Sequence, residues 1–255
     1  SPSMFCSRRC CLKRLNNKEK ILDIHLYTNR FVVELYLFII ARFIGSKITL
    51  ERSEHPLQDF GQSLIERTKL RLVLSCEPRL FDGVICISNY LADFYQKKGF
   101  KRKQILIIPG TVDTSRFTSG TESPLRFEFI FYCGSLTILK DGVDILIKSY
   151  SAIAEKYRDL FLVLAGKGDT VEEEIEIRQL VDDLGLHEKV IFLGQVPRND
   201  IPGYLIHSKI LALARPSSFI ADAGFPSKLT EYLASGKPTV VTRVGEIPYY
   251  LKDHD

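Results

Sequence analysis

Strand-like and helix-like patterns alternate along nearly the whole chain, and this alternation constrains the fold more than any other feature. Short apolar runs of strand length are followed, after a turn, by longer segments with apolar residues three or four apart. The expected strands are 21–27, 47–50, 83–87, 104–108, 128–132, 160–164, 190–193, 210–214 and 239–242, and the expected helices are 31–44, 62–74, 89–98, 143–157, 171–184, 202–206 and 228–235. Such alternation with short connections is typical of α/β proteins with parallel sheets.

The alternation stops once, in a segment rich in turn formers. From Pro109-Gly110 to Ser123-Pro124 the chain is poor in apolar residues, which is the composition of an interdomain linker. A length of 255 residues also allows one large or two modest domains. We therefore expect one α/β domain at 21–113, a linker at 114–127 and a second α/β domain at 128–255.

Basic residues concentrate in a short arm at residues 1–20. The arm holds six Lys and Arg residues and only Glu19 against them, a balance of +5, whereas the net charge of the whole chain is +4. The remaining residues therefore sum to −1, and nucleic-acid binding by the whole protein has no support. With 45% hydrophobic residues the chain can bury a real core.

The six cysteines and five histidines predict no metal site. No CxxC pair occurs, and the sequence around Cys86 and Cys133 is apolar, so we expect free thiols in a reducing, cytoplasmic compartment. The apolar run Phe31–Ile44 is interrupted by Glu34 and Arg42 and is shorter than the ~20 residues of a bilayer span. We expect a buried helix there, with peripheral contact at the inner membrane face as the alternative, helped by the basic arm.

Three loops that follow expected strands of the second domain could hold a ligand. In open α/β sheets, ligands bind beyond the carboxyl ends of the strands. Gly134 would let a ligand approach the backbone, and Lys140 offers a cation beside a helix start. Gly166 belongs to a lone GxG, and Val196 follows the strand at 190–193. Each signal is weak by itself, since a solvated lysine or a tight turn explains it equally well.

The segment 226–238, PSKLTEYLASGKP, carries more information. Pro226 starts a helix that Gly236 ends, with Leu229 and Leu233 facing the core. The amides of residues 227–229 could hold an anion, and Glu231 could accept hydrogen bonds from sugar hydroxyls. The alternative is a surface ion pair between Lys228 and Glu231.

Together these motifs resemble the retaining glycosyltransferases of the GT-B fold, family 4 (glycosyl transferases group 1). The resemblance rests on IPGTVD at 108–113, YCGS at 132–135, KDG at 140–142, Gly194 and PSKLTEYLASGKP at 226–238, in this order. It implies two Rossmann-like doubly wound domains facing across a cleft. Residues 21–113 would be the second half of the acceptor domain, and residues 128–255 an incomplete nucleotide-sugar domain. The chain thus resembles an internal fragment, truncated at both ends and inactive by itself.

The resemblance also assigns roles to residues. Lys140 would contact the donor diphosphate and Glu231 the ribose, while Glu51 would act on the acceptor side as the third catalytic residue. The implied donor-binding residues are Gly134, Ser135, Lys140, Gly166, Val196, Ser227, Lys228, Leu229, Thr230 and Glu231. No metal and no cofactor are implied, because the nucleotide-diphosphate sugar is a substrate.

The implied function is transfer of a hexose from a nucleotide-diphosphate sugar to a carbohydrate or lipid-linked acceptor, with retention, in polysaccharide or glycoconjugate biosynthesis. Two positions depart from the family: Ser135 stands where Arg is frequent, and Ala223 where a first Glu is frequent, eight residues before Glu231. They motivate the alternative of a non-catalytic nucleotide-sugar-binding module. A nucleotide-sugar epimerase of the same fold is the other alternative.

Overall fold

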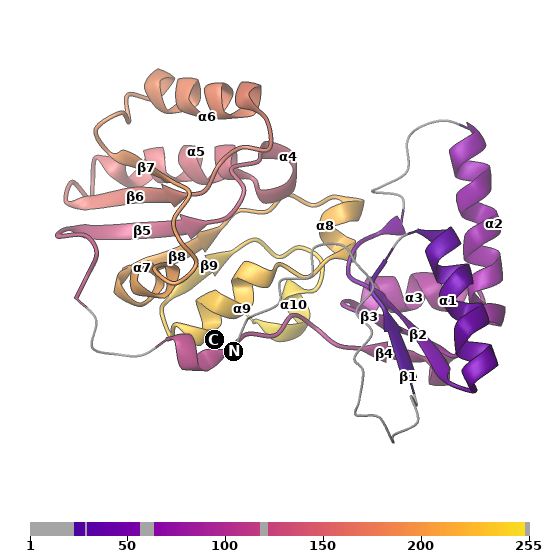
Figure 1. Cartoon of the computed structure of the whole chain (residues 1–255). Helices are drawn as coiled ribbons and strands as arrows, with labels where there is room; N and C mark the ends of the chain where they lie inside the picture. Colours follow the sequence, from indigo (N-terminus) through magenta and orange to yellow (C-terminus); the bar gives the residue numbers. More distant parts are fainter. Residues whose placement is uncertain (1–22, 29, 57–63, 118–121, 253–255) are drawn as a thin grey trace. The chain divides into compact units, whose positions relative to one another are not determined.

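The computed structural model describes residues 23–28, 30–56, 64–117 and 122–252, which form two compact units (Figure 1). The first unit comprises residues up to Pro109 together with Asp222–Phe225, and the second comprises Gly110–Ala221 and the residues from Pro226 onward. The expected linker at 114–127 thus clusters with the second unit, as far as it is described. The basic arm at 1–20 lies outside the described residues.

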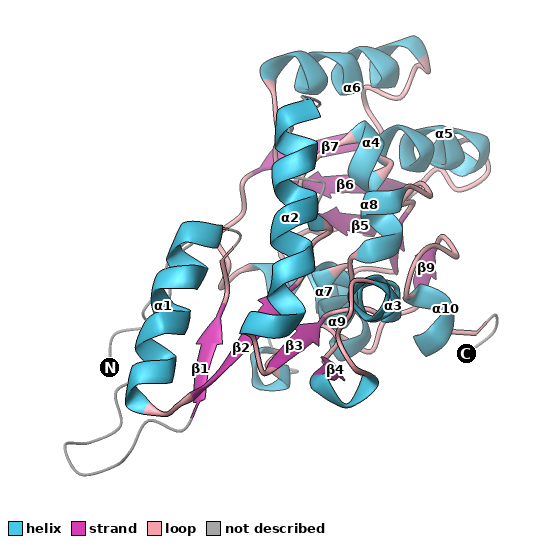
Figure 2. Ribbon diagram, turned by 90° about the vertical axis from the view of Figure 1, so that its right-hand side faces the viewer, coloured by secondary structure: helices cyan, strands magenta, loops and turns pink. Residues whose placement is uncertain are grey.

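The described part of the first unit has four parallel strands in chain order. These are β1 (Asp23–Leu26), β2 (Lys47–Arg52), β3 (Gly83–Cys86) and β4 (Ile105–Ile107). The connecting helices are α1 (Phe31–Ile44), α2 (Leu64–Leu80) and α3 (Asn89–Lys97). Because every strand is added on the same side, right-handed crossovers place all three helices on one face. Figure 2 shows α1 and α2 in front of this sheet.

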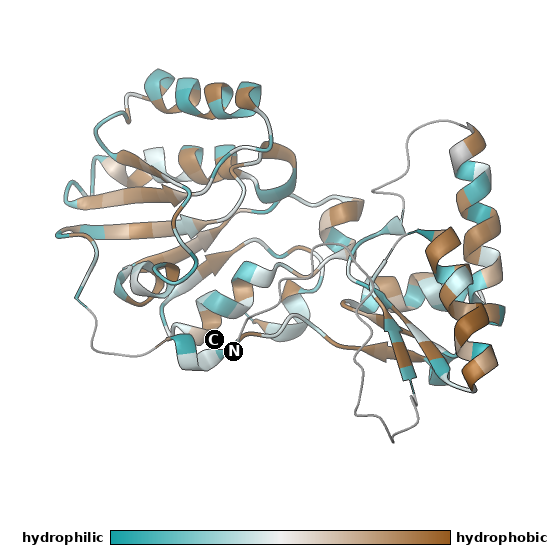
Figure 3. Ribbon diagram, viewed as in Figure 1, coloured by the Kyte–Doolittle hydropathy of each residue, from teal (hydrophilic) through white to brown (hydrophobic). Residues whose placement is uncertain are grey.

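The helix α1 has the predicted bounds but is not a buried helix. Only Glu34, Leu37 and Ala41 of α1 are buried, whereas Phe43 is 89% exposed. Figure 3 shows α1 as almost continuously hydrophobic. The prediction of burial was wrong because apolar composition does not determine how many sides of a helix find a partner. No helix among the described residues combines the length and apolar character needed to cross a bilayer.

The second unit contains five parallel strands in the order β7-β6-β5-β8-β9. Their bounds are β5 (Glu128–Cys133), β6 (Leu160–Ala165), β7 (Val190–Gly194), β8 (Ile210–Leu213) and β9 (Thr239–Val241). The helices are α4 (Ile138–Asp141), α5 (Val143–Ala154), α6 (Val171–Asp183), α7 (Ile201–His207), α9 (Ser227–Ala234) and α10 (Ile247–Tyr250), and α8 (Phe219–Ala223) begins in this unit and ends with residues of the first. Figure 1 shows α5 and α6 on one face of this sheet and α7 and α9 on the other.

The strand order reverses at β5, which makes the neighbourhood of β5 and β8 a topological switch point. The core of the second unit surrounds these central strands, where Phe129, Phe131, Leu162 and Leu211 are fully buried. Both sheets are therefore open and parallel, as the alternation of patterns predicted.

The helix α6 is capped by Thr170 and exposes two of its apolar side chains. Thr170 Oγ1 accepts a hydrogen bond from the Glu173 amide at 3.1 Å. Val171 and Ile175 are 71% and 61% exposed. The Glu173 carboxylate accepts from the Ile138 amide at 2.8 Å instead of closing the capping box, so that the charged first turn is directed at α4.

Candidate functional site

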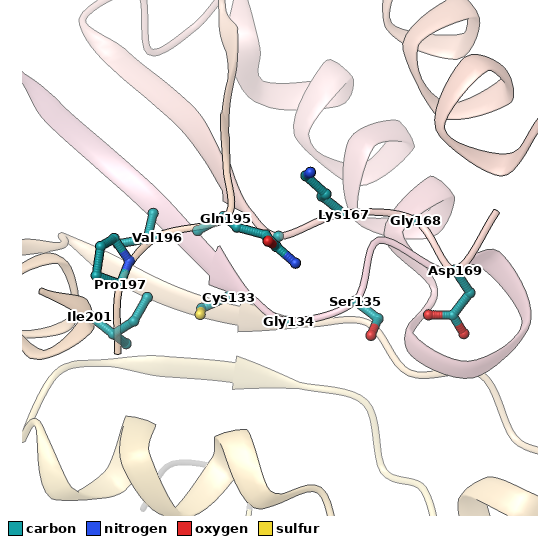
Figure 4. A pocket seen from close by; sticks show the side chains of 12 residues that line it. Cys133, Gly134, Ser135, Lys167, Gly168, Asp169, Gln195, Val196, Pro197 and Ile201 are labelled. Carbon is teal, nitrogen blue, oxygen red and sulfur yellow. The ribbon is translucent and has the colours of Figure 1, made fainter. Parts of the chain in front are cut away.

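Loops at the carboxyl ends of β5, β6 and β7 surround a pocket of about 620 Å³. The strand register brings these ends together, since Cys133 pairs with Ala165 and Ala165 with Gly194. The lining residues are Cys133, Gly134, Ser135, Ala165, Gly166, Lys167, Gly168, Asp169, Gln195, Val196, Pro197 and Ile201 (Figure 4). Four of the predicted donor-binding residues, Gly134, Ser135, Gly166 and Val196, are thus brought to one pocket.

Two of the lining glycines have no room for a side chain in the present arrangement. Gly134 and Gly166 have φ values of +154° and +144°. A Cβ atom on Gly166 would lie 1.8 Å from the carbonyl oxygen of Gly134, and a Cβ atom on Gly134 would lie 2.4 Å from Lys228 Nζ. A larger residue at position 166 would push the two loops apart, and one at position 134 would displace the Lys228 side chain, so these glycines define the floor of the pocket.

Backbone hydrogen bonds fix the loops to one another. The Gly134 amide donates to Ala165 O at 2.9 Å, the Gly166 amide to Gly194 O at 2.7 Å, and the Leu136 amide to Lys167 O at 2.8 Å. The three loops therefore form one connected surface, and their polar groups are held in place before a ligand arrives.

Lys228 is the cation that the fold brings next to this floor. Its Nζ is 2.8 Å from Asp141 Oδ1 and donates to the Tyr132 hydroxyl at 3.0 Å, while the side chains of Lys228 and Asp141 are 16% and 5% exposed. Burial lowers the pKa of Lys228, and the nearby Asp141 carboxylate opposes that shift. The Tyr132 hydroxyl in turn donates to Ser135 O at 2.6 Å, so that Lys228 supports the loop that carries Ser135.

Lys140, in contrast, is exposed on α4 and does not line the pocket. It precedes Asp141, whose carboxylate pairs with Lys228. The one-turn helix α4 thus carries two adjacent charged residues, Asp141 with a paired carboxylate and Lys140 with an exposed ammonium group.

Glu231 is paired with Arg116 and not with Lys228. Arg116 Nη1 lies 2.8 Å from Glu231 Oε1, and Arg116 Nη2 donates to Arg198 O at 2.9 Å. The expected alternative, a surface pair between Lys228 and Glu231, is therefore wrong. Glu231 is partly exposed, and Arg116 holds its carboxylate through Oε1.

The start of α9 differs from the predicted anion site in one respect. The Leu229 amide donates to Pro226 O at 2.9 Å, so it is not free for an anion. Thr230 Oγ1 donates to Ser227 O at 2.6 Å, which tightens the same turn. Leu229 is buried as expected, but Leu233 is exposed, and Tyr232 takes its place in the core. The Tyr232 hydroxyl accepts from the Cys133 amide at 3.2 Å and so connects α9 to the pocket.

The structure places Glu51 and Ala223 in the first unit. Glu51 is exposed on β2, where it pairs in register with Ile85. Ala223 is fully buried in the core of that unit, and its carbonyl accepts a hydrogen bond from Ser88 Oγ. Ser88 Oγ also accepts from the Leu91 amide at 3.0 Å, so Ser88 is the N-cap of α3.

The two ends of the pocket differ in chemical character. Val196, Pro197 and Ile201 lie at one end, and Ser135 and Asp169 at the other (Figure 4). An apolar end suits a planar ring, whereas hydroxyl, carboxylate and backbone groups suit a polyhydroxylated or phosphorylated part. Burial raises the pKa of the Cys133 thiol to about 11, so this pocket residue is a neutral thiol.

Sequence reasoning missed Arg116, Tyr132 and Asp141, which hold Glu231, Ser135 and Lys228 in place. The spacing along the chain gives no signal for these pairs, because Arg116 and Glu231 are 115 residues apart. Among the described residues there is no group of three or more His, Cys, Asp or Glu side chains that could hold a metal ion.

Comparison with known proteins supplies the family. The model of the family "Glycosyl transferases group 1" matches residues 115–255. A phosphatidylinositol N-acetylglucosaminyltransferase component of Arabidopsis thaliana is 23% identical over 243 residues, covering 95% of this chain and 52% of that protein. The mannosylfructose-phosphate synthase of Agrobacterium fabrum is 30% identical over 193 residues, covering 69% of this chain and 40% of that enzyme. The chain spans about half the length of the curated relatives it matches.

Solved structures show the same fold. HepE of Anabaena in complex with UDP-glucose superposes with a TM-score of 0.68 at 19% identity, over 90% of this chain and 62% of that one. A glycosyltransferase from Rickettsia africae gives a TM-score of 0.67 at 16% identity, over 91% of this chain and 60% of that one. These neighbours are GT-B glycosyltransferases, and the parallel sheets of the present chain are Rossmann-like. Since the family model covers more than half of the residues, the chain belongs to the group 1 glycosyl transferases.

Proposed function

We propose that the pocket of the second unit binds a nucleotide-diphosphate sugar and that the protein of which it is part transfers the sugar to a carbohydrate or lipid-linked acceptor with retention. The observation that carries this proposal is the contact between Gly134 and Gly166 at the carboxyl ends of β5 and β6. Because neither residue has a side chain, backbone groups form the bottom of the pocket, and the pocket lies in the unit that the group 1 family model matches.

The two ends of the pocket fit the two parts of such a donor. The base would lie against Val196, Pro197 and Ile201, and the diphosphate near Gly134 and Ser135. Glu231 Oε2 would accept hydrogen bonds from the ribose, with Oε1 held by Arg116. Lys140 and Lys167 are exposed cations on neighbouring loops that would offset the charge of the departing diphosphate, so the proposal needs no metal.

The names of similar proteins support this ligand class. The HepE structure is described as a complex with UDP-glucose, and a mycobacterial relative 25% identical over 182 residues is named a GDP-mannose-dependent phosphatidylinositol monomannoside mannosyltransferase. These names favour a lipid-linked or glycan acceptor without fixing the base or the sugar. Free thiols at Cys76, Cys86 and Cys133 fit the cytoplasmic side of a membrane, where nucleotide sugars would be available.

A non-catalytic binding module is the second candidate. Ser135 replaces the arginine that the family resemblance would place against the diphosphate, and Ala223 is committed to the core of the first unit. A measured transfer to an acceptor, with the anomeric configuration of the product read by NMR, separates this candidate and an epimerase from a retaining transferase.

Donor binding is tested by titrating UDP, GDP and ADP, each beside its nucleoside, against the wild-type chain and three variants. Lys140→Ala should weaken binding of the diphosphate at least tenfold and leave nucleoside binding unchanged, because it removes only a charge-assisted phosphate contact. Glu231→Gln should weaken both ligands, by about 1.5–3 kcal/mol, because both contain the ribose. Lys148→Ala is the matched control, since Lys148 is an exposed lysine on α5 that pairs with Asp144.

Two results would contradict the proposal. If no nucleotide binds while both units remain folded, the pocket is not a donor site. If Lys140→Ala and Lys148→Ala behave alike, Lys140 is a solvated lysine without a role in binding.

A further inference from the structure

The first unit contains a second cavity, of about 710 Å³, which the proposed function does not use. It lies between α1 and α2 and reaches Arg52, the last residue of β2, so it is at the carboxyl end of the sheet of this unit. Its walls are largely apolar and include Val33, Leu70, Leu72, Val73 and Leu74. A volume in this range accommodates a small organic molecule.

A buried charge cluster forms the polar part of this cavity. Arg52 Nη2 lies 2.9 Å from Glu34 Oε1 and 2.8 Å from Glu77 Oε1. Arg52 Nε donates to the Tyr95 hydroxyl at 3.1 Å, and Nη1 donates to Thr28 O at 2.5 Å. The three charged side chains are 1–5% exposed. Two carboxylates thus share one guanidinium, and every nitrogen of Arg52 already has an acceptor.

One atom of this cluster is left without a partner. Glu77 Oε2 is buried and accepts no hydrogen bond from any residue that the structure describes. Glu77 itself is 2% exposed and lines the cavity. An unsatisfied buried carboxylate oxygen is costly, and a protonated Oε2 would in turn need an acceptor. Whether Glu77 is ionised or protonated, Oε2 therefore needs a hydrogen-bond partner, and a bound molecule can supply it.

We propose that this cavity binds a small amphipathic molecule whose apolar body packs between α1 and α2 and whose hydrogen-bond-donating head contacts Glu77 Oε2. A protonated amine complements the site best, because the cluster carries two carboxylates against one guanidinium. A hydroxyl can donate the same hydrogen bond without the charge. An anionic head would be repelled by the two carboxylates at this atom and would bind instead beside Arg30 and Lys69, the exposed cations that also line the cavity. The site lies within the first unit, so its occupancy does not depend on the proposed donor pocket.

The test compares three probes of one shape: phenethylamine, 2-phenylethanol and phenylacetate. Binding to the full chain at neutral pH is followed by NMR titration. We expect the amine to bind most tightly, the alcohol more weakly and phenylacetate most weakly, with shift changes confined to α1, α2 and the end of β2. Equal binding of the three probes, binding of none of them, or shifts located at the Gly134 loop would overturn the proposal.

The variant Glu77→Gln isolates the head-group contact. The amide keeps the size of the side chain and one acceptor for Arg52 but replaces the other carboxylate oxygen with a donor. The amine should bind at least tenfold more weakly, whereas Asp93→Asn, which changes an exposed carboxylate on α3 of the same unit but outside the cavity, should leave its affinity unchanged. An unaltered affinity in folded Glu77→Gln protein would overturn the assignment. The order of the three probes on the wild-type chain decides the question if that variant does not fold. UDP binding, measured on the same samples, reports separately on the donor pocket.

Discussion

At the scale of single residues, the pocket depends on the absence of side chains at Gly134 and Gly166. Gly134 O occupies the space that a side chain on Gly166 would need, and Lys228 Nζ occupies the space beside Gly134. The glycines thus let a strand end, a neighbouring loop and a buried cation meet at one point. Gly185 also has a positive φ, of +67°, but no atom lies within 4 Å of the Cβ that it could carry. The two kinds of glycine make different predictions.

Gly166→Ala should abolish nucleotide binding, because its Cβ would displace the Gly134 loop from the floor of the pocket. Gly185→Ala should bind nucleotide like the wild type and should lose only the strain of a left-handed alanine, about 1–2 kcal/mol of unfolding free energy. Isothermal titration with a nucleoside diphosphate and urea unfolding measure the two effects. Full affinity in Gly166→Ala would mean that the loop contact has no role in the site.

Single residues were predicted where the local sequence limits what a position can do. A glycine after an apolar strand, as at Gly134 and Gly166, is one such signal, and a proline at a helix start, as at Pro226, is another. Partners could not be predicted, because Lys228 and Tyr132 are 96 residues apart and meet only after the sheet has formed. Arg116 could not be predicted for the same reason, since it is far along the chain from Glu231, the predicted residue with which it pairs.

At the scale of elements, the bounds of a helix could be predicted where a capping residue ends it. Helices too short to show a hydrophobic period could not be predicted. Helix α1 was predicted from end to end, since Gly45 adopts a left-handed φ of 68° and stops it. Helix α2 continues to Leu80, beyond the predicted 74, with Pro78 inside its last turn. The one-turn helices α4 and α10 gave no periodic signal, because four residues make little more than one turn.

The ion pairs of Glu34, Arg52 and Glu77 connect α1, β2 and α2, and their contribution to the stability of the first unit depends on pH. Burial raises the pKa of Glu34 and of Glu77 above the ordinary value, although Arg52 opposes the shift for both. The folded unit therefore binds more protons than the unfolded chain between the ordinary and the raised pKa values. Protonation stabilises the fold below this range, and that contribution is lost as the pH rises through the raised values.

Replacing Glu77 by Gln should therefore flatten the pH dependence of the first unit. We expect the unfolding free energy of the wild type to fall between pH 5 and pH 8 relative to the variant, by about 1.4 kcal/mol for each unit by which the Glu77 pKa is raised. Amide hydrogen exchange of β2 and β3 reports on this unit alone. The same difference between the two proteins at both pH values would refute a raised pKa. The pair is surrounded by Arg52, Tyr95 and Cys86. These groups do not titrate in this range, since the pKa of each is raised above an ordinary value that already lies above pH 8.

At the scale of the whole molecule, the described residues form two hydrophobic cores. One core includes Phe129, Phe131 and Leu162, and the other includes Leu50, Val84 and Leu91. The restart of the strand pattern after Pro124 predicted this division, because a second run of strands and helices builds its own sheet. The return of the chain to the first unit at Asp222–Phe225 was not predicted, since a segment of four residues carries no pattern of its own.

Separate cores predict two unfolding transitions and an effect of nucleotide on only one of them. The donor pocket lies within the second unit, so a nucleoside diphosphate at a hundredfold its Kd should stabilise that unit by about 2.7 kcal/mol. The first unit should unfold at an unchanged temperature, and in doing so it releases Asp222–Phe225 without opening the core around β5. Calorimetry counts the transitions, and hydrogen exchange of β3 and β6 amides assigns them to their units. Phenethylamine supplies the reciprocal measurement, since it should shift only the transition assigned to β3. A single transition that moves with either ligand would show that the two cores unfold as one cooperative unit.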